Sequence, residues 1–234
     1  MEVGSNRHAL GLVAAFGVVA SLSGQPQQPR ERPDSHPRVL ISIAARQLWV
    51  LNAAGDTLYA APVAVGSGKT MLWRGKRWTF DTPRGDHRVL SKEKDPVWIP
   101  PQWYYVEEAR ERRLDVVELQ RGKSFPIGMG QSLIVRRDSV GILGADSTFR
   151  PLPPSAFIVF GRTLFVPPFG TVNRRIKGTL GSYRLNLGGG FGLHGTPDHG
   201  SIPKPVTHGC VRLHDADIAW LYENVPVGSV VKVF

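Results

Sequence analysis

Short apolar runs, some of them alternating with polar residues, recur along the chain, and this is the pattern of β-strands. Glycine and proline separate the runs, as they separate strands in all-β domains. The runs lie at residues 39–43, 47–51, 57–65, 131–135, 157–160, 163–166, 180–187 and 229–234. The pattern predicts a mainly β protein whose first three strands form a meander.

Two segments have the composition and spacing of helices. Residues 106–119 carry Val106, Ala109, Leu114 and Val117 at near-helical spacing, with charged residues between them, which predicts a surface helix. Near the C-terminus Asp215 is a candidate N-cap for a short helix whose apolar side chains would pack on a sheet. We therefore expect only a few short helices.

The N-terminal segment resembles an export signal. A polar stretch with Arg7 precedes an apolar run over residues 9–22, and Ser21-Leu22-Ser23 offers a small-residue cleavage site, so residues 1–23 are predicted to be a signal peptide. Residues 24–38 are rich in Pro, Gln and Arg and are predicted to be a disordered linker. If the signal stays uncleaved, it is the only expected membrane contact.

The remaining residues, 39–234, suit one domain with one sizeable core, given that 41% of the 234 residues are hydrophobic. The formal net charge of +10 favours a polyanionic environment, and nucleic acid, anionic lipid and anionic cell wall all qualify. Export makes nucleic acid the poorest of the three. We expect a protein of the bacterial periplasm or cell envelope that binds no nucleic acid.

Cys210 is the only cysteine, and it lies in a segment that also supplies histidines. A thiolate is a strong nucleophile, but an ordinary thiol is mostly protonated at neutral pH and needs a base or a positive field. His194 is the candidate base. Gly209 leaves the backbone beside the thiol open for an oxyanion, and His208 and Arg212 would stabilise negative charge there. The alternative is a small buried cysteine without chemistry.

The same residues raise the question of a metal. Zinc could be bound by a set drawn from the neighbouring histidines and the thiol, but their spacing matches no zinc template. These residues are His194, His199, His208, Cys210 and His214.

The run Gly66-Ser67-Gly68-Lys69-Thr70 lacks the upstream glycine of a phosphate-binding loop, since Val63 stands there. We predict no metal and no cofactor.

Two short motifs carry a family resemblance: His194-Gly195-Thr196, and Thr207-His208-Gly209-Cys210-Val211-Arg212. They resemble the catalytic signature of the L,D-transpeptidase (YkuD-type) family. The resemblance implies a β-sandwich or open barrel, with Cys210 as the nucleophile that becomes acylated and His194 as its base. It also implies that Thr207, His208, Gly209 and Arg212 form the oxyanion and substrate-binding site.

The resemblance covers residues 39–85 and 180–234. Within the first part it includes the segment 62–66 and the turn Thr82-Pro83-Arg84-Gly85. The residues between are a long insertion, placed at about 104–178, that would cover the thiol cleft as a lid or flap. Dense aromatic residues near its start are candidates for a wall of the substrate groove; these are Trp98, Trp103, Tyr104 and Tyr105.

Three functions remain open at this stage. The resemblance implies a cysteine acyl-transferase that cross-links or remodels peptidoglycan stem peptides, with carbapenem-type β-lactams as candidate inhibitors. The second is a peptidase or amidase in which water resolves the same thioester. The third is a metal-binding or structural envelope protein. The first two share every catalytic residue, so the sequence does not separate them.

Overall fold

The computed structural model describes Met1 and residues 36–154 and 156–234. The predicted signal peptide after Met1 and most of the predicted linker lie outside this range. Among the helices of the described residues, none combines the length and the apolar character that crossing a bilayer requires.

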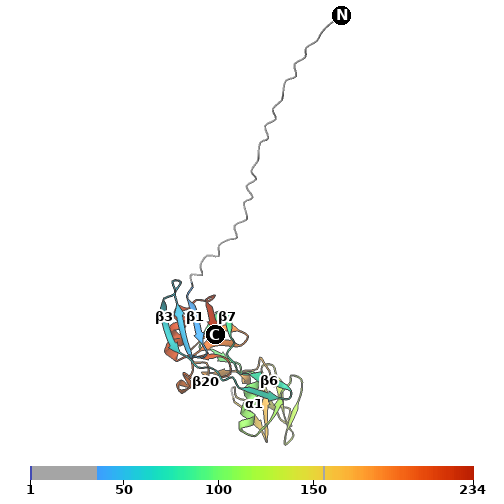
Figure 1. The fold of residues 1–234 in the computed structure, drawn as a ribbon. Coiled ribbons are helices and arrows are strands. Elements are labelled where there is room, and N and C mark those ends of the chain that lie inside the picture. Colours follow the sequence, from blue (N-terminus) through green and yellow to red (C-terminus); the bar gives the residue numbers. More distant parts are fainter. Residues whose placement is uncertain (2–35, 155) are drawn as a thin grey trace. The chain divides into compact units, whose positions relative to one another are not determined.

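Two sheets form the main body of the fold (Figure 1). The first has the order β3 (Thr57–Pro62), β2 (Gln47–Leu51), β1 (Arg38–Ser42), β22 (Val230–Val233) and β7 (Gly85–Arg88). The second has the order β21 (Val211–Arg212), β19 (Phe191–His194), β18 (Tyr183–Gly188) and β8 (Ser91–Lys94). The meander predicted for the first three strands is confirmed, because β1 pairs antiparallel with β2 and β2 with β3.

One apolar cluster joins the two sheets and the helix α2 (Asp215–Asn224). It includes Ile41 and Val50 from the first sheet, Leu185 and Leu193 from the second, and Leu221 from α2, all fully buried. Two sheets that share one core form a sandwich. The prediction of a mainly β sandwich is confirmed, and neither sheet closes into a barrel within the described residues.

The insertion has two apolar clusters of its own. They are built by α1 (Gln102–Glu111), by the sheet β10 (Asp115–Glu118), β16 (Thr163–Val166), β15 (Ile158–Phe160), and by the sheet β11 (Phe125–Gly128), β12 (Gln131–Arg136), β13 (Ser139–Leu143), β14 (Phe149–Pro151). Met71 and Phe80, which precede the predicted insertion, belong to the first of these clusters. The insertion therefore packs on the hairpin that comes before it.

Short two-stranded pairs connect these parts. They are β5 (Thr70–Trp73) with β6 (Lys76–Thr79), β4 (Val65–Gly66) with β20 (Pro205–Thr207), and β9 (Val97–Trp98) with β17 (Ile176–Lys177). Two 3₁₀ turns, Val172–Arg174 and His199–Ser201, complete the described elements. The β4–β20 pair ties the segment before the cysteine to the first third of the chain.

Both helix predictions need correction. The helix predicted over 106–119 begins at Gln102, directly after Pro101, and ends at Glu111, and residues 115–118 form strand β10 instead. Arg113 adopts a positive φ of 55°, which ends the helix, and the β-branched pair that follows is suited to a strand. In the second helix the N-cap position belongs to His214, so Asp215 is its first helical residue and not its cap.

Candidate active site

Residues of the four strands of the second sheet lie directly opposite one another in a single row. Glu93 on β8 pairs with Arg184 on β18, Arg184 pairs with His194 on β19, and His194 pairs with Arg212 on β21. Residues directly opposite in neighbouring strands share a face of the sheet. The adjacent residue Leu185 belongs to the core, so the row occupies the face away from it.

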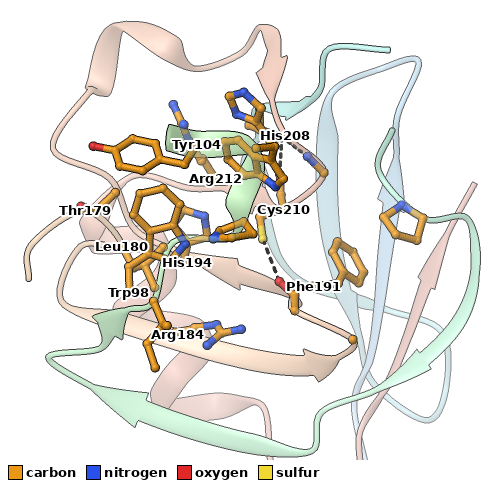
Figure 2. Close-up of a pocket in the computed structure, with 18 of the residues that line it drawn as sticks. Trp98, Tyr104, Thr179, Leu180, Arg184, Phe191, His194, His208, Cys210 and Arg212 are labelled. Atoms are coloured by element: carbon orange, nitrogen blue, oxygen red, sulfur yellow. Dashed lines mark hydrogen bonds between the residues drawn. The ribbon is translucent and has the colours of Figure 1, made fainter. Parts of the chain in front are cut away.

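This face borders a cavity of about 870 Å³. The cavity is lined by all six residues that the sequence singled out, namely His194, Thr207, His208, Gly209, Cys210 and Arg212. Figure 2 shows the side chains of Cys210, His194 and His208 gathered on one side of it, with Trp98 and Tyr104 facing them. Residues separated by up to eighteen positions in the sequence, from His194 to Arg212, are thus brought to one surface.

The thiol of Cys210 is partly buried at this surface. Its Sγ lies 3.6 Å from the carbonyl oxygen of Gly190, a distance that suits a weak S–H donor. Burial raises the pKa of the Cys210 thiol, while a backbone hydrogen bond from Gly192 and the charges of Arg184 and Arg212 lower it by smaller amounts. The resting group is therefore the protonated thiol, and attack requires that the proton be removed.

His194 is 4% exposed and its ring is held by the backbone. Nδ1 lies 2.6 Å from the carbonyl oxygen of Gly195, and because a carbonyl only accepts, Nδ1 carries the proton. Nε2 is then the free basic nitrogen. Burial lowers the pKa of His194 to about 4; the Gly195 hydrogen bond opposes this shift, and the nearby arginines add to it. His194 is consequently a neutral base at physiological pH.

The buried neutral imidazole predicts a specific loss of stability in acid. Below about pH 6.5 the unfolded chain binds a proton at residue 194 that the folded chain binds only near pH 4. Between pH 8 and pH 4 the wild-type protein should therefore lose about 3 kcal/mol more free energy of unfolding than His194→Gln. Urea unfolding of both proteins at the two pH values measures this difference. Equal losses would contradict the burial of a neutral ring.

Thr207 organises the turn that carries the cysteine. Its hydroxyl donates to the carbonyl oxygen of Cys210 at 2.6 Å and accepts from the N–H of Gly209 at 3.2 Å. From outside the turn, the hydroxyl of Thr82 donates to the carbonyl of Gly209 at 2.9 Å and accepts from the N–H of Gly66 at 2.7 Å. The segment 62–66 and the turn 82–85, which both belong to the family resemblance, are thus connected through Thr82 to the turn that carries the cysteine.

Gly209 must be glycine for two reasons. Its φ is +126°, a conformation that residues with a side chain rarely adopt, and a Cβ there would lie 3.1 Å from the carbonyl oxygen of Asp81. Its N–H, a candidate oxyanion donor from the sequence, donates a hydrogen bond to the hydroxyl of Thr207 within the turn.

His208 is held by the insertion. Its Nε2 lies 2.9 Å from Oε2 of Glu107, and its ring stacks on Trp103 with centroids 4.0 Å apart and planes at 10°. Phe80 meets the same ring edge-on at 4.4 Å. No local sequence pattern indicates the contact between Glu107 and His208, because the two residues are 101 positions apart. Helix α1 therefore determines where the imidazole next to the cysteine points.

Removing the charge of Glu107 should slow the acylation of Cys210 and change the stability of the fold only slightly. We expect Glu107→Gln to lower the acylation rate about tenfold, as losing one charge-assisted hydrogen bond does. The free energy of unfolding should change by about 1 kcal/mol or less, because the pair is partly exposed. Glu108→Gln is the matched control, since Glu108 pairs with Arg112 within the helix. If Glu107→Gln and Glu108→Gln were acylated at equal rates, the contact of Glu107 with His208 would have no role in the acylation of Cys210.

Arg212 and two further histidines, His199 and His214, have looser contacts than His194 and His208. Nη1 of Arg212 lies 4.0 Å from Oδ2 of Asp198 within the loop before the cysteine, so the guanidinium is loosely held. His199 and His214 approach each other, with Nδ1 atoms 3.3 Å apart. In the described part of the chain, no three residues among His, Cys, Asp and Glu come together as a metal-binding group.

Aromatic residues at and just before the start of the insertion form one wall of the cavity, as predicted for three of the four. Trp98, Trp103 and Tyr104 line it, whereas Tyr105 is 4% exposed and packs in the insertion's own core. The lining residues do not include any from 121–177 among those described. The groove wall therefore comes from the start of the insertion, and the later strands of the insertion support it from behind.

The fold and the site together define the class of protein. It is a β-sandwich whose cavity contains a cysteine and a neutral histidine, and an inserted segment forms one wall of that cavity. The family model of the YkuD L,D-transpeptidase catalytic domain matches residues 36–233. The chain belongs to this family.

Individual relatives match over shorter stretches. The probable L,D-transpeptidase YbiS of Escherichia coli is 45% identical over 53 residues, which is 23% of this chain and 17% of the relative. The probable L,D-transpeptidase ErfK/SrfK of Salmonella typhimurium is 22% identical over 196 residues, 83% of this chain and 43% of the relative. The chain thus spans less than half the length of these curated relatives.

Solved structures show weaker likeness. The L,D-transpeptidase of Xylanimonas cellulosilytica has a TM-score of 0.44 at 16% identity, covering 89% of this chain and 65% of that one. L,D-transpeptidase 3 of Mycobacterium tuberculosis, solved with a faropenem-derived adduct, has a TM-score of 0.45 at 17% identity, covering 85% and 60%.

Proposed function

We propose that this protein is an L,D-transpeptidase that acts on peptidoglycan stem peptides through a thioester on Cys210. The observation that carries the proposal is the cavity that brings the thiol and a neutral, oriented imidazole to one surface. Membership in the family supports the same reaction. The excess of basic residues suits an anionic wall polymer, and we place the protein in the periplasm or cell envelope.

The reaction would proceed in two steps. As the sulfur of Cys210 attacks the peptide carbonyl, Nε2 of His194 takes the thiol proton, and the carbon–nitrogen bond then breaks. The departing amine receives that proton from His194, which leaves the acyl group on sulfur as a thioester. In the second step an acceptor amine attacks the thioester carbonyl and gives a proton to His194, the carbon–sulfur bond breaks, and His194 returns that proton to the departing sulfur of Cys210.

The oxyanion of each step needs donors close to the cysteine. Since the N–H of Gly209 is used within the turn, we assign the task to the N–H of Cys210 together with the positive charge of Arg212. His208, held by Glu107, would line the same site and orient the substrate. Thr207 serves the turn itself and would not touch the substrate.

Hydrolysis is the second candidate, because water could resolve the same thioester. The aromatic wall favours transfer, since Trp98, Trp103 and Tyr104 cover part of the cavity with apolar surface that lowers access of water. Transfer and hydrolysis start from the same thioester but release different products.

Mass spectrometry tests the proposal at both levels. Purified protein is incubated with a carbapenem and, separately, with a tetrapeptide stem, and the intact mass is recorded over time. We expect an adduct of one β-lactam, loss of the terminal amino acid from the stem, and cross-linked product when an acceptor stem is added. Release of the free tripeptide alone would assign hydrolysis. Absence of any adduct on Cys210 would overturn the proposed function.

A further inference from the structure

The positive charge of the chain is concentrated in the later part of the insertion. Residues 121–177 contain nine arginines and lysines and two aspartates, so this segment accounts for +7 of the formal net charge of +10. The described residues that line the cavity include none from this segment. The acyl-transfer reaction therefore gives these charges no task.

Three exposed arginines gather at the turn between β12 and β13. Arg136 is the last residue of β12, and Arg137 follows it in the two-residue turn. The guanidinium of Arg121 donates to the carbonyl oxygen of Arg137 and, at 3.3 Å, to that of Phe169. The backbone around the turn thus holds a third positive charge beside the other two.

The turn itself is anchored to the rest of the insertion. The N–H of Val172 donates to the carbonyl oxygen of Asp138 at 2.8 Å. The N–H of Val140, at the start of β13, donates to the side-chain oxygen of Asn173 at 2.7 Å. The arginines therefore stand on a fixed piece of backbone and not on a free loop.

An aromatic ring orients the side chain of Arg136. The guanidinium carbon of Arg136 lies 4.8 Å from the centroid of the Phe149 ring. That ring fills the space above Gly141 on the neighbouring strand, where a Cβ would overlap it. A guanidinium that stacks on a ring keeps the donors at its edge free, so Arg136 is oriented and still able to bind a ligand.

The protein does not neutralise these three charges. Among the described residues, none of the three arginines forms an ion pair with a carboxylate. The acidic residue of the turn, Asp138, accepts a hydrogen bond from the hydroxyl of Ser139 at 3.3 Å. Guanidinium groups that are held in place and unpaired favour carboxylate or phosphate ligands, which they bind through two parallel hydrogen bonds.

We infer that Arg121, Arg136 and Arg137 form a docking site for a glycan strand that carries carboxylate groups at intervals. Carboxylates on one polymer meet several guanidiniums in a single binding event, so weak contacts add up to useful affinity. A lipid surface fits less well, because it requires an apolar face. Phe169 is a single exposed ring beside the site, and the guanidinium of Arg174 lies 3.7 Å from its centroid. Only the choice of a glycan rests on the proposed function.

Binding of a fluorescent polygalacturonate oligomer, measured by anisotropy, tests the site without any reaction. This glycan has one carboxylate on each sugar, and dextran of the same length is the neutral control. We expect the wild-type protein to bind polygalacturonate and not dextran. A variant with glutamine at all three arginines should lose about tenfold or more in affinity, and added salt should weaken its residual binding less than it weakens the binding of the wild type.

The matched control removes three positive charges elsewhere. Arg38, Arg77 and Lys232 are exposed strand residues outside the insertion. Their triple glutamine variant should bind polygalacturonate within about twofold of the wild type, since only the long-range attraction of the net charge changes.

A second variant guards against misfolding of the first. Arg136→Gln combined with Arg137→Gln keeps Arg121 and its two bonds to the backbone. Because two of the three guanidiniums are lost, its affinity for polygalacturonate should fall about fivefold. Carbapenem acylation and thermal unfolding of every variant show that the protein is folded.

The outcomes separate docking from catalysis. The docking site is overturned if the wild type does not bind polygalacturonate, if the triple variant and its matched control bind it equally, or if phosphatidylglycerol vesicles or polyphosphate bind the three arginines more tightly. None of these results touches the acyl-transfer proposal, because carbapenem acylation is measured separately. Binding of polygalacturonate by a protein that forms no adduct on Cys210 would have the opposite meaning: the proposed function would fail and the docking site would stand.

Discussion

Replacing Cys210 with serine is expected to abolish acyl-enzyme formation, with a loss on the order of 10⁴–10⁶-fold. The hydroxyl is a far weaker acid than the thiol, and the proposed base gives little help, because His194 is an imidazole of low proton affinity whose pKa is about 4. Intact mass after incubation with a carbapenem measures the effect directly.

The same substitution should leave the fold intact. The sulfur makes two weak contacts, one with the carbonyl of Gly190 at 3.6 Å and one with the backbone of Gly192, and the turn is held by Thr207 and Thr82 and not by the thiol. We expect a change of about 1 kcal/mol or less in the free energy of unfolding. A β-lactam adduct that still formed on the folded serine variant would assign the nucleophile to another residue.

The local pattern was sufficient for several of the strands, and the role of Cys210 as the nucleophile stays a prediction. The runs 47–51 and 163–166 are strands with the predicted bounds, because each alternates or is fully apolar and ends in a turn. The helix predicted over 106–119 was wrong in its bounds, because the near-helical spacing of apolar residues continues by chance to Val117, beyond the end of α1 at Glu111. The β-branched residues Val116 and Val117 pair with β16 instead, a long-range contact that no local pattern contains.

The partners of the site residues could be predicted only in part. Arg184 alternates with the buried Leu185, so its place on the polar face of β18 follows from the period of a strand. That Glu93 lies opposite it depends on the pairing of β8 with β18, which the sequence does not reveal. The contact of Glu107 with His208 depends on how the insertion docks, and insertion contacts have no local signature.

His194→Gln should lower the acylation rate by about 10²–10⁴-fold, the usual cost of losing a general base. Glutamine keeps the size of the side chain and can still donate to the carbonyl of Gly195, so the turn and the cavity should persist. Rapid-mixing measurements with a β-lactam substrate give the rate constant for each protein, and thermal unfolding at pH 8 checks the fold.

The pH dependence of the same rate distinguishes His194 from His208 as the base. Because His194 has a pKa of about 4, the wild-type rate should be flat from pH 5.5 to pH 7.5 and fall only near pH 4, where the imidazole gains its proton. The residual rate of His194→Gln should instead rise with pH as the thiol of Cys210, whose pKa is raised by burial, ionises without a base. An unchanged profile in this variant would move the base to His208, and His208→Gln would then show the larger loss.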